Sequence, residues 1–307
     1  MYMFKILDPR NIPAAIASND AIFAEAPKGV LGIEVTVPAL AARCTLGNID
    51  PQHTGGDVGQ AAIEAACTCP FPADEAVLAT VRADLDSVGA MAVLALRREI
   101  GDAVATSYRI KQIADFDKSA TGPWQPATLP ASANAWPRWE NGLERGLGAL
   151  SAMVFDHKLP FSERVAIMKE WLMTGPDAIP VRYAEQSDAD RADLIRALES
   201  NEIHREVRDG IAVVETGHKA ATTVGYSLAP VMVALNPEFR FGGGEPHRKF
   251  TICAWSAQHA DIKSALVELA EFEPGWGGSP TIGGSPQGVS SALTIDQVVG
   301  VVAKHLK

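Results

Sequence analysis

The segment from residue 77 to residue 98 limits the fold more than any other part of the chain. Residues 77–81, VLATV, form a short apolar run, which predicts a buried strand. Residues 87–98 form an apolar, alanine-rich stretch, which predicts a helix, and a polar turn joins the two. A strand, a turn and a helix make half of a βαβ unit, and such units build parallel sheets. The segment therefore predicts an α/β fold.

The flanking sequence continues this pattern in two parts. Before residue 205 we expect a strand at 30–38 and helices at about 57–66, 108–116, 139–153, 161–173 and 187–200. After it we expect strands at 211–214, 231–235 and 249–254, and helices at 219–228, 261–271 and from about 294. We therefore predict an N-terminal parallel-sheet domain over residues 1–185 with a helical insertion around 139–173, a linker helix at 186–204, and a smaller α/β domain at 205–307.

Composition excludes several classes of function. The 307 residues are 47% apolar, which suffices for two cores, and no apolar run approaches the roughly 18 residues of a transmembrane helix. The net charge of −10 disfavours a long nucleic acid as partner, because such binding depends on Lys and Arg. The N-terminus lacks the apolar core of a secretory signal, and the four cysteines lack metal or redox spacing. We expect a cytoplasmic protein without membrane association.

Asp84 and Asp86 are the first candidates for chemistry. They lie between the predicted strand at 77–81 and the helix that follows. Ligands of open α/β sheets bind beyond the carboxyl ends of the strands, and two carboxylates there can bind a divalent cation. The alternative is structural, because Asp86 or Ser87 can instead cap the helix.

Three further segments carry potential metal ligands. His53 lies in a polar loop after the predicted strand at 30–38, Asp115 and Asp117 end a predicted helix, and Asp156 and His157 lie between two helices. Imidazole is a common metal ligand, and paired carboxylates at a helix C-terminus are electrostatically unfavourable without a cation. The alternatives are turn formation for the first segment and solvated surface charge for the other two.

A glycine-rich stretch at residues 275–288 is the candidate for anion binding. It holds six glycines together with Ser and Thr, so backbone N–H groups and hydroxyls are available for a phosphate. The alternative is a flexible loop. The candidate substrate-binding residues are Gly277, Gly278, Ser279, Gly283, Gly284, Ser285 and the basic residues Arg248, Lys249 and His218.

Together these segments resemble the DHH phosphoesterase superfamily. The sequence VLATVRADLDSVGAMAVLAL is similar to the first motif of that family, and GWGGSPTIGGSPQG lies where the family carries its G-G-H loop. The resemblance implies a metal-site domain, a smaller DHH-associated substrate-binding domain and a cleft between them. It also implies catalytic roles for Asp84, Asp86 and His53, and a metal, Mn²⁺ or Mg²⁺, held by these three and by Asp115, Asp117, Asp156 and His157.

The function that this resemblance implies is metal-dependent hydrolysis of a small phosphate ester or phosphodiester, either nucleotide-like or another phosphorylated metabolite. The Asp-His-His sequence and the histidine of the G-G-H loop are absent here. Two alternatives therefore stay open: a non-catalytic protein that binds a small anion, and a hydrolase of a non-phosphate bond that uses the same carboxylates. A homodimer is the default expectation for the assembly.

Overall fold

The computed structural model describes residues 2–10, 12–51, 60–118, 142–240, 245–278, 280–286 and 288–307. The chain divides into two compact units. Unit 1 comprises Met1–Lys118 and Trp139–Asp188, and unit 2 comprises Ser119–Arg138 and Ala189–Lys307. The division falls within helix α8 (Val181–Glu199).

Unit 1 is built on a four-stranded parallel sheet. The strands are β1 (Met3–Ile6), β2 (Val30–Ile33), β3 (Asn48–Ile49) and β4 (Val77–Thr80), in the order β1-β4-β2-β3. All three pairings are parallel. The α/β fold class with a parallel N-terminal sheet is thus confirmed, including the predicted strand at the start of the 77–98 segment.

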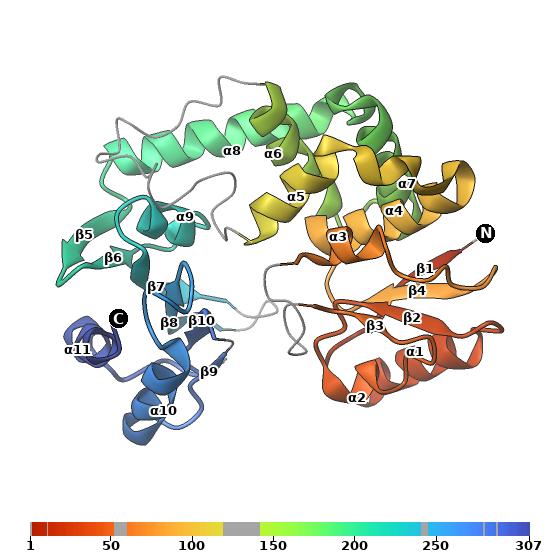
Figure 1. Ribbon diagram of the computed structural model, residues 1–307. Helices are drawn as coiled ribbons and strands as arrows, with labels where there is room; N and C mark the ends of the chain where they lie inside the picture. The colour runs from red at the N-terminus through yellow and green to blue at the C-terminus, as the bar shows by residue number, and fades with distance from the viewer. Residues whose placement is uncertain are drawn as a thin grey trace. The chain divides into compact units, whose positions relative to one another are not determined.

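Helices cover both faces of this sheet (Figure 1). Neighbouring residues of a strand point to opposite faces, so Leu31 and Leu78 join one core while Val30 and Val77 join the other. The first core includes α3 (Ala62–Ala66), α4 (Leu85–Ile100), α5 (Tyr108–Lys118), α6 (Gly142–Val154) and α7 (Phe161–Thr174). The second packs against α1 (Pro13–Ala24) and α2 (Pro38–Ala41).

Helix α4 lies close to its neighbour α3. A Cβ atom on Gly89 would lie 2.6 Å from Cδ1 of Ile63, so no larger residue fits there without a shift. Asp102, beyond the C-terminus of α4, lies 3.0 Å from Arg97, whose buried guanidinium also donates to the carbonyls of Ala66 and Cys69, each at 2.8 Å. These contacts hold the two helices together at both ends of α3.

Unit 2 is built on a six-stranded mixed sheet. Its strands are β5 (His204–Arg208), β6 (Ile211–Glu215), β7 (Val231–Phe239), β8 (His247–Ala254), β9 (Gly277–Gly278) and β10 (Ile282–Gly284), in the order β5-β6-β7-β8-β10-β9. The pairing of β6 with β7 is parallel and the other pairings are antiparallel.

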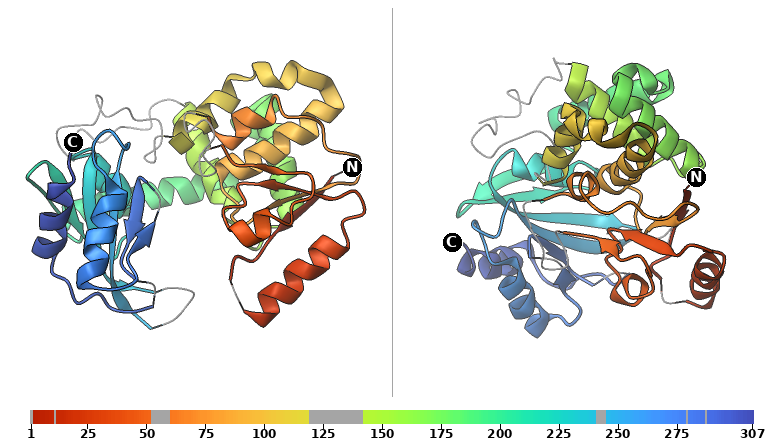
Figure 2. Two further views of the ribbon diagram at one scale, coloured as in Figure 1. Left: turned by 60° about the horizontal axis from the view of Figure 1, so that its bottom comes forward. Right: turned by 45° about the vertical axis from the view of Figure 1, so that its right-hand side comes forward.

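Alternation along the strands again makes two cores. Ile211 and Val213 face α10 (Ile262–Phe272) and α11 (Ile295–Lys304), whereas Ala212 and Val214 face α9 (Ala221–Tyr226) and the end of α8. Figure 2 shows α10 and α11 side by side, and Thr294 caps α11 through the backbone N–H of Gln297.

Some element boundaries differ from the sequence prediction. The charged helix expected at 187–200 is α8, which begins earlier, at Val181, because only a short 3-10 turn at Pro176–Ala178 separates it from α7. Strand β5 and the N-terminal pair β1 and α1 were not predicted. Within the described parts of the chain, no helix is long and apolar enough to cross a bilayer.

Candidate functional site

Acidic side chains gather at the carboxyl end of the unit 1 sheet. Glu34 directly follows β2, Asp50 directly follows β3, and Asp84 and Asp86 follow β4. Parallel strands present their carboxyl ends at one edge, which is where ligands of open α/β sheets bind. Asp117, in the last turn of α5, is within electrostatic reach of the same group. We call these five residues the carboxylate cluster.

Two members of the cluster, Glu34 and Asp86, have raised pKa values. Burial, followed by the charges of Asp84, Asp86, Asp117 and Asp50 in that order, raises the pKa of Glu34 to about 10. Burial and the charge of Asp117 likewise raise the pKa of Asp86 to about 8. Repulsion of this kind is what a bound cation relieves, because it favours the ionised form of each neighbouring carboxylate.

Asp84 and Asp86 also have structural roles. The Asp84 carboxylate accepts the backbone N–H of Ser87 at 3.0 Å, and the Ser87 hydroxyl accepts the backbone N–H of Asp84 at 3.1 Å, which together form a capping box on α4. Asp86 is fully buried, and its two oxygens accept the backbone N–H groups of Ala62 and Ile63 at 2.7 and 2.8 Å. Asp84 therefore caps its own helix, and Asp86 caps α3 from a distance.

Glu34 has an unusual backbone conformation. Its φ of 51° lies in the left-handed region, which is uncommon for a residue other than glycine. The turn is held on both sides, because the Glu34 N–H donates to the carbonyl of Ile49 at 2.9 Å and the Asn48 side chain bonds the backbone of Val35. Such conformations persist where the surrounding structure fixes them, and they concentrate at functional sites.

The other predicted metal ligands have other environments. Asp115 pairs with Lys111 at 2.9 Å, Asp156 accepts the hydroxyl of Tyr183 at 2.8 Å, and His157 is exposed. His53 lies outside the described residues. Of the predicted set, the structure brings together Asp84, Asp86 and Asp117.

The donor chemistry of the carboxylate cluster suits a hard divalent cation, which prefers oxygen ligands such as carboxylates. Within the described ranges, however, no three His, Cys, Asp or Glu residues lie close enough together to hold a metal ion. Both oxygens of Asp86 are already used as caps. The cluster therefore matches such an ion in its chemistry, while its described members stand further apart than a closed coordination shell requires.

A second group of predicted residues lines a pocket within unit 2. It has a volume of about 430 Å³, and Lys249, Gly277, Gly283, Gly284 and Ser285 are among its lining residues. They come from β8 and from the β9–β10 hairpin, which pairs with β8. We call it the glycine pocket; Ser279, within its hairpin, lies outside the described residues.

Close backbone approach explains the glycines of this hairpin. A Cβ atom on Gly284 would lie 2.3 Å from the carbonyl oxygen of Phe250, and one on Gly278 would lie 2.2 Å from that of Ile282. Lys249 is only 8% exposed, and burial lowers the pKa of its amine. That amine donates to the carbonyl of Ser285 and faces no carboxylate among its recorded contacts, which leaves its charge available to an anion.

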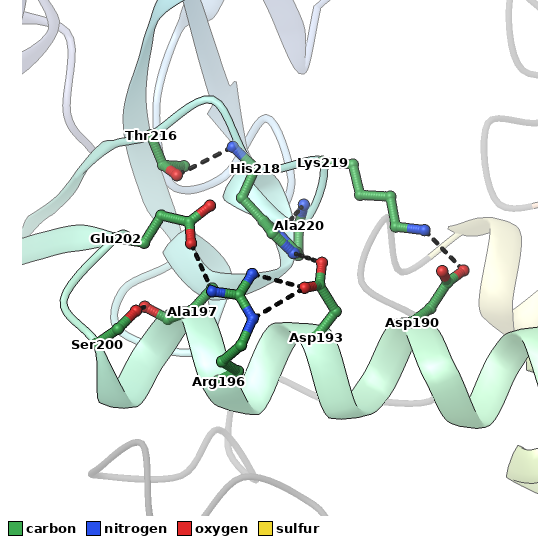
Figure 3. Close-up of polar contacts among 10 residues, drawn as sticks. All are labelled: Asp190, Asp193, Arg196, Ala197, Ser200, Glu202, Thr216, His218, Lys219 and Ala220. Atoms are coloured by element: carbon green, nitrogen blue, oxygen red, sulfur yellow. Dashed lines mark hydrogen bonds and ion pairs between the residues drawn. The ribbon is translucent and has the colours of Figure 1, made fainter.

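Arg248 and His218 serve neighbouring loops instead. Arg248 donates to the carbonyls of Ser291 and Leu293 at 3.0 and 3.2 Å. Figure 3 shows that Nδ1 of His218 accepts the backbone N–H of Ala220 at 3.1 Å, while Nε2 lies 3.1 Å from the carboxylate of Asp193. Nε2 therefore carries the proton and donates it to Asp193, which ties the loop after β6 to α8.

Sequence reasoning missed Glu34 and gave Asp50 no role as a ligand. Glu34 stood inside a run that predicts a strand, and Asp50 inside a loop assigned to turn formation. The signal that could have found them is position, because each is the first residue after a strand of a parallel sheet.

No family model and no curated protein matches the chain. Among solved structures, it is similar to the pGpG-specific phosphodiesterase PggH of Vibrio cholerae, with 8% sequence identity and a TM-score of 0.43 over 76% of this chain and 80% of that chain.

Proposed function

We propose that this chain is a divalent-cation-dependent hydrolase of a small phosphate ester or phosphodiester, with a nucleotide-like molecule as the first substrate class to test. The observation that carries the proposal is the carboxylate cluster at the carboxyl ends of β2, β3 and β4. A cluster whose members raise one another's pKa binds a proton or a cation in place of full ionisation.

In this proposal Glu34, Asp50, Asp84 and Asp117 are the candidate ligands of the cation, Mn²⁺ or Mg²⁺, which would have to draw them closer together than the described residues lie. Asp86 holds α3 in place through its two backbone bonds. The bound ion would supply Lewis-acid activation of a phosphoryl oxygen and a water of lowered pKa. Glu34, with a pKa of about 10, carries a proton at neutral pH in the metal-free protein and would release it when the cation binds.

The glycine pocket is the proposed anchor for the substrate's phosphate. Gly277 has open space where a side chain would lie, and the Lys249 amine is a buried cation that lines the same pocket. Backbone N–H groups together with a lysine are a recurrent way to bind phosphate oxygens.

The test is metal content by elemental analysis, on protein purified without chelator, for the wild type and for the variants Glu34→Gln and Asp84→Asn. We expect bound Mn or another divalent metal in the wild type, loss of that metal in both variants, and metal-dependent turnover in a phosphoester panel. Alanine at Asp86 is unsuitable here, because it would remove both caps of α3. A wild type that binds no metal after reconstitution would contradict the proposal.

One observation favours a second candidate, a non-catalytic protein that binds a small anion. Both oxygens of Asp86 are engaged by backbone N–H groups, and the described residues do not bring three metal ligands together. This candidate predicts tight binding of a phosphorylated ligand in the glycine pocket and no turnover across the panel. Product analysis in the same panel separates hydrolysis of a phosphate bond from hydrolysis of any other bond.

A further inference from the structure

A second pocket lies within unit 1, beside the edge strand β1. It has a volume of about 750 Å³ and is lined by residues of β1, α4 and α7 and by Tyr2, which precedes β1. Among them are Phe4 and Lys5 from β1, Arg98 from α4, and Ala166 and Lys169 from α7. Its volume falls within the roughly 300–1,000 Å³ that small-molecule sites occupy.

This pocket is separate from the carboxylate cluster. Asp86 lies in the first turn of α4 and Arg98 in the last. They are twelve positions apart in the helix, which corresponds to about 18 Å along the axis at ~1.5 Å per residue. Tyr2 likewise precedes β1, whereas the carboxylates follow their strands. The pocket is therefore at the opposite end of the sheet from the proposed hydrolytic site.

The charge of the pocket is opposite to that of the chain. Its lining holds three cations, Lys5, Arg98 and Lys169, against one carboxylate, Glu99, in a chain of net charge −10. Lys169 pairs with Glu99 at 2.5 Å. The Lys5 amine has no recorded ion pair among the described residues.

Arg98 offers a further donor. Its guanidinium bonds Asp74 and lies over the ring of Tyr2, 5.2 Å from the ring centroid. Its Nη1 is buried without a hydrogen-bond partner among the residues that the structure describes. A buried donor of this kind is destabilising unless an acceptor reaches it. An anionic head group entering the pocket would provide one.

The remaining walls are apolar. Tyr2 is 4% exposed, and Ala95, Val165 and Phe4 add aliphatic and aromatic surface. The backbone N–H groups of Met3 and Leu7 donate to carbonyls at Ala76 and Thr80, on the β4 side of β1. The backbone groups of Phe4 therefore face the open edge of the sheet. An apolar wall beneath a cationic rim suits a molecule with an apolar tail and an anionic head.

We propose that this pocket is a binding site for a small amphipathic anion, with a carboxylate head at Lys5 and Arg98 and an apolar tail against Tyr2, Phe4 and Val165. The site does not depend on the proposed hydrolase activity, because it shares no residue with the carboxylate cluster or the glycine pocket.

The test is calorimetric titration of the full-length chain with decanoate. Ala166 is exposed on α7 and lines the pocket, so Ala166→Trp fills the pocket without disturbing the core. Ala17→Trp, at an exposed position of α1, is the matched control for bulk. Lys5→Gln removes a rim charge, and Lys263→Gln on α10 is its matched control.

We expect saturable binding of decanoate by the wild type and by both controls. The dissociation constant for decanoate should rise about tenfold in Ala166→Trp and about threefold in Lys5→Gln. Decyltrimethylammonium, which has the same tail and the opposite charge, should not compete. Absence of saturable binding, equal binding by Ala166→Trp and the wild type, or competition by the cationic amphiphile would each overturn the proposal.

Discussion

The carboxylate cluster of unit 1 and the glycine pocket of unit 2 are assembled in opposite ways. The cluster draws five acidic residues from four separate segments of a parallel sheet and its helices, and their charges raise the pKa values of Glu34 and Asp86. The glycine pocket comes from one strand and the hairpin beside it, and its single buried cation lies among backbone groups. The first arrangement concentrates like charges, whereas the second omits side chains so that backbone segments pack closely.

The two sites therefore lower the free energy of unfolding for different physical reasons. The cluster depends on desolvated, mutually repelling carboxylates, so its cost varies with pH and with cations. The pocket depends mainly on close backbone packing, which is a steric requirement, and its one electrostatic cost is the burial of Lys249, whose pKa is lowered. Substitutions at each site should reveal this difference.

Asp86→Ala should have the largest effect on the stability of the fold. It leaves the backbone N–H groups of Ala62 and Ile63 buried without acceptors, which should lower the free energy of unfolding by about 2–4 kcal/mol. Urea denaturation followed by circular dichroism measures this. Asp84→Ala is the matched control, since it removes a more exposed cap and should cost only about 1 kcal/mol. Equal losses for the two variants would show that Asp86 is not the principal cap of α3.

Glu34→Gln should stabilise the metal-free protein, and increasingly so at higher pH. The folded-state pKa of Glu34 is about 10 against an ordinary value of 4.5, so the wild type loses stability as pH rises through that interval. Glutamine has no proton to lose. We expect the variant to gain little at pH 5 and at least about 1.4 kcal/mol at pH 8, which corresponds to one pKa unit.

Urea titrations of the wild type and the variant at several pH values, in metal-free buffer, test this. If the difference in unfolding free energy stays constant with pH, charge repulsion does not act on Glu34 in the cluster. Excess Mn²⁺ should reverse the order, because an ion that binds the folded state stabilises it by mass action.

Lys249→Gln should weaken phosphate binding without changing stability or its pH dependence near neutrality. Loss of a buried cation from the glycine pocket should reduce affinity for inorganic phosphate or a nucleoside monophosphate about fivefold, or ~1 kcal/mol. Calorimetry against the control Lys263→Gln measures the effect. Unchanged affinity in Lys249→Gln would place the anion site elsewhere.

His218→Asn should have the smallest effect. It removes the bond to Asp193 on α8 and part of a buried side chain, while the amide oxygen of Asn can still accept the Ala220 N–H, so we expect a loss of about 1 kcal/mol in unfolding free energy. Phosphate affinity should stay unchanged, because His218 does not line the glycine pocket. A fall in phosphate affinity would instead assign His218 to the substrate, as the sequence first suggested.

The same contrast explains what the sequence could predict. The strand at 77–81, the helix after it, and three strands and three helices of unit 2 follow from local periodicity, and the structure contains them, whereas β5, β9 and β10 were not predicted as strands. The glycine-rich hairpin was visible because its unusual residues are contiguous. Glu34 was not, because a left-handed turn ends β2 where the sequence continues with β-branched residues.

The sequence also did not show which basic residues are already hydrogen-bonded to other parts of the protein. Arg248 and His218 were predicted to meet a substrate, yet both hold loops of unit 2 through hydrogen bonds. Strand β1 was missed because its four residues are too few to show an alternating pattern. Helix α1 was missed because its apolar residues do not form a stripe along one face.

The conformation of Glu34 has a consequence for laboratory evolution. Its backbone favours glycine, its carboxylate is desolvated, and its neighbours repel it, so replacement by glycine should improve folding on all three counts. A library selected for heat resistance alone should therefore discard this residue among the first, whereas a library grown under selection for activity should keep it. The frequency of Glu34 in the two surviving pools would measure directly how much folding stability this chain gives up for what the cluster does.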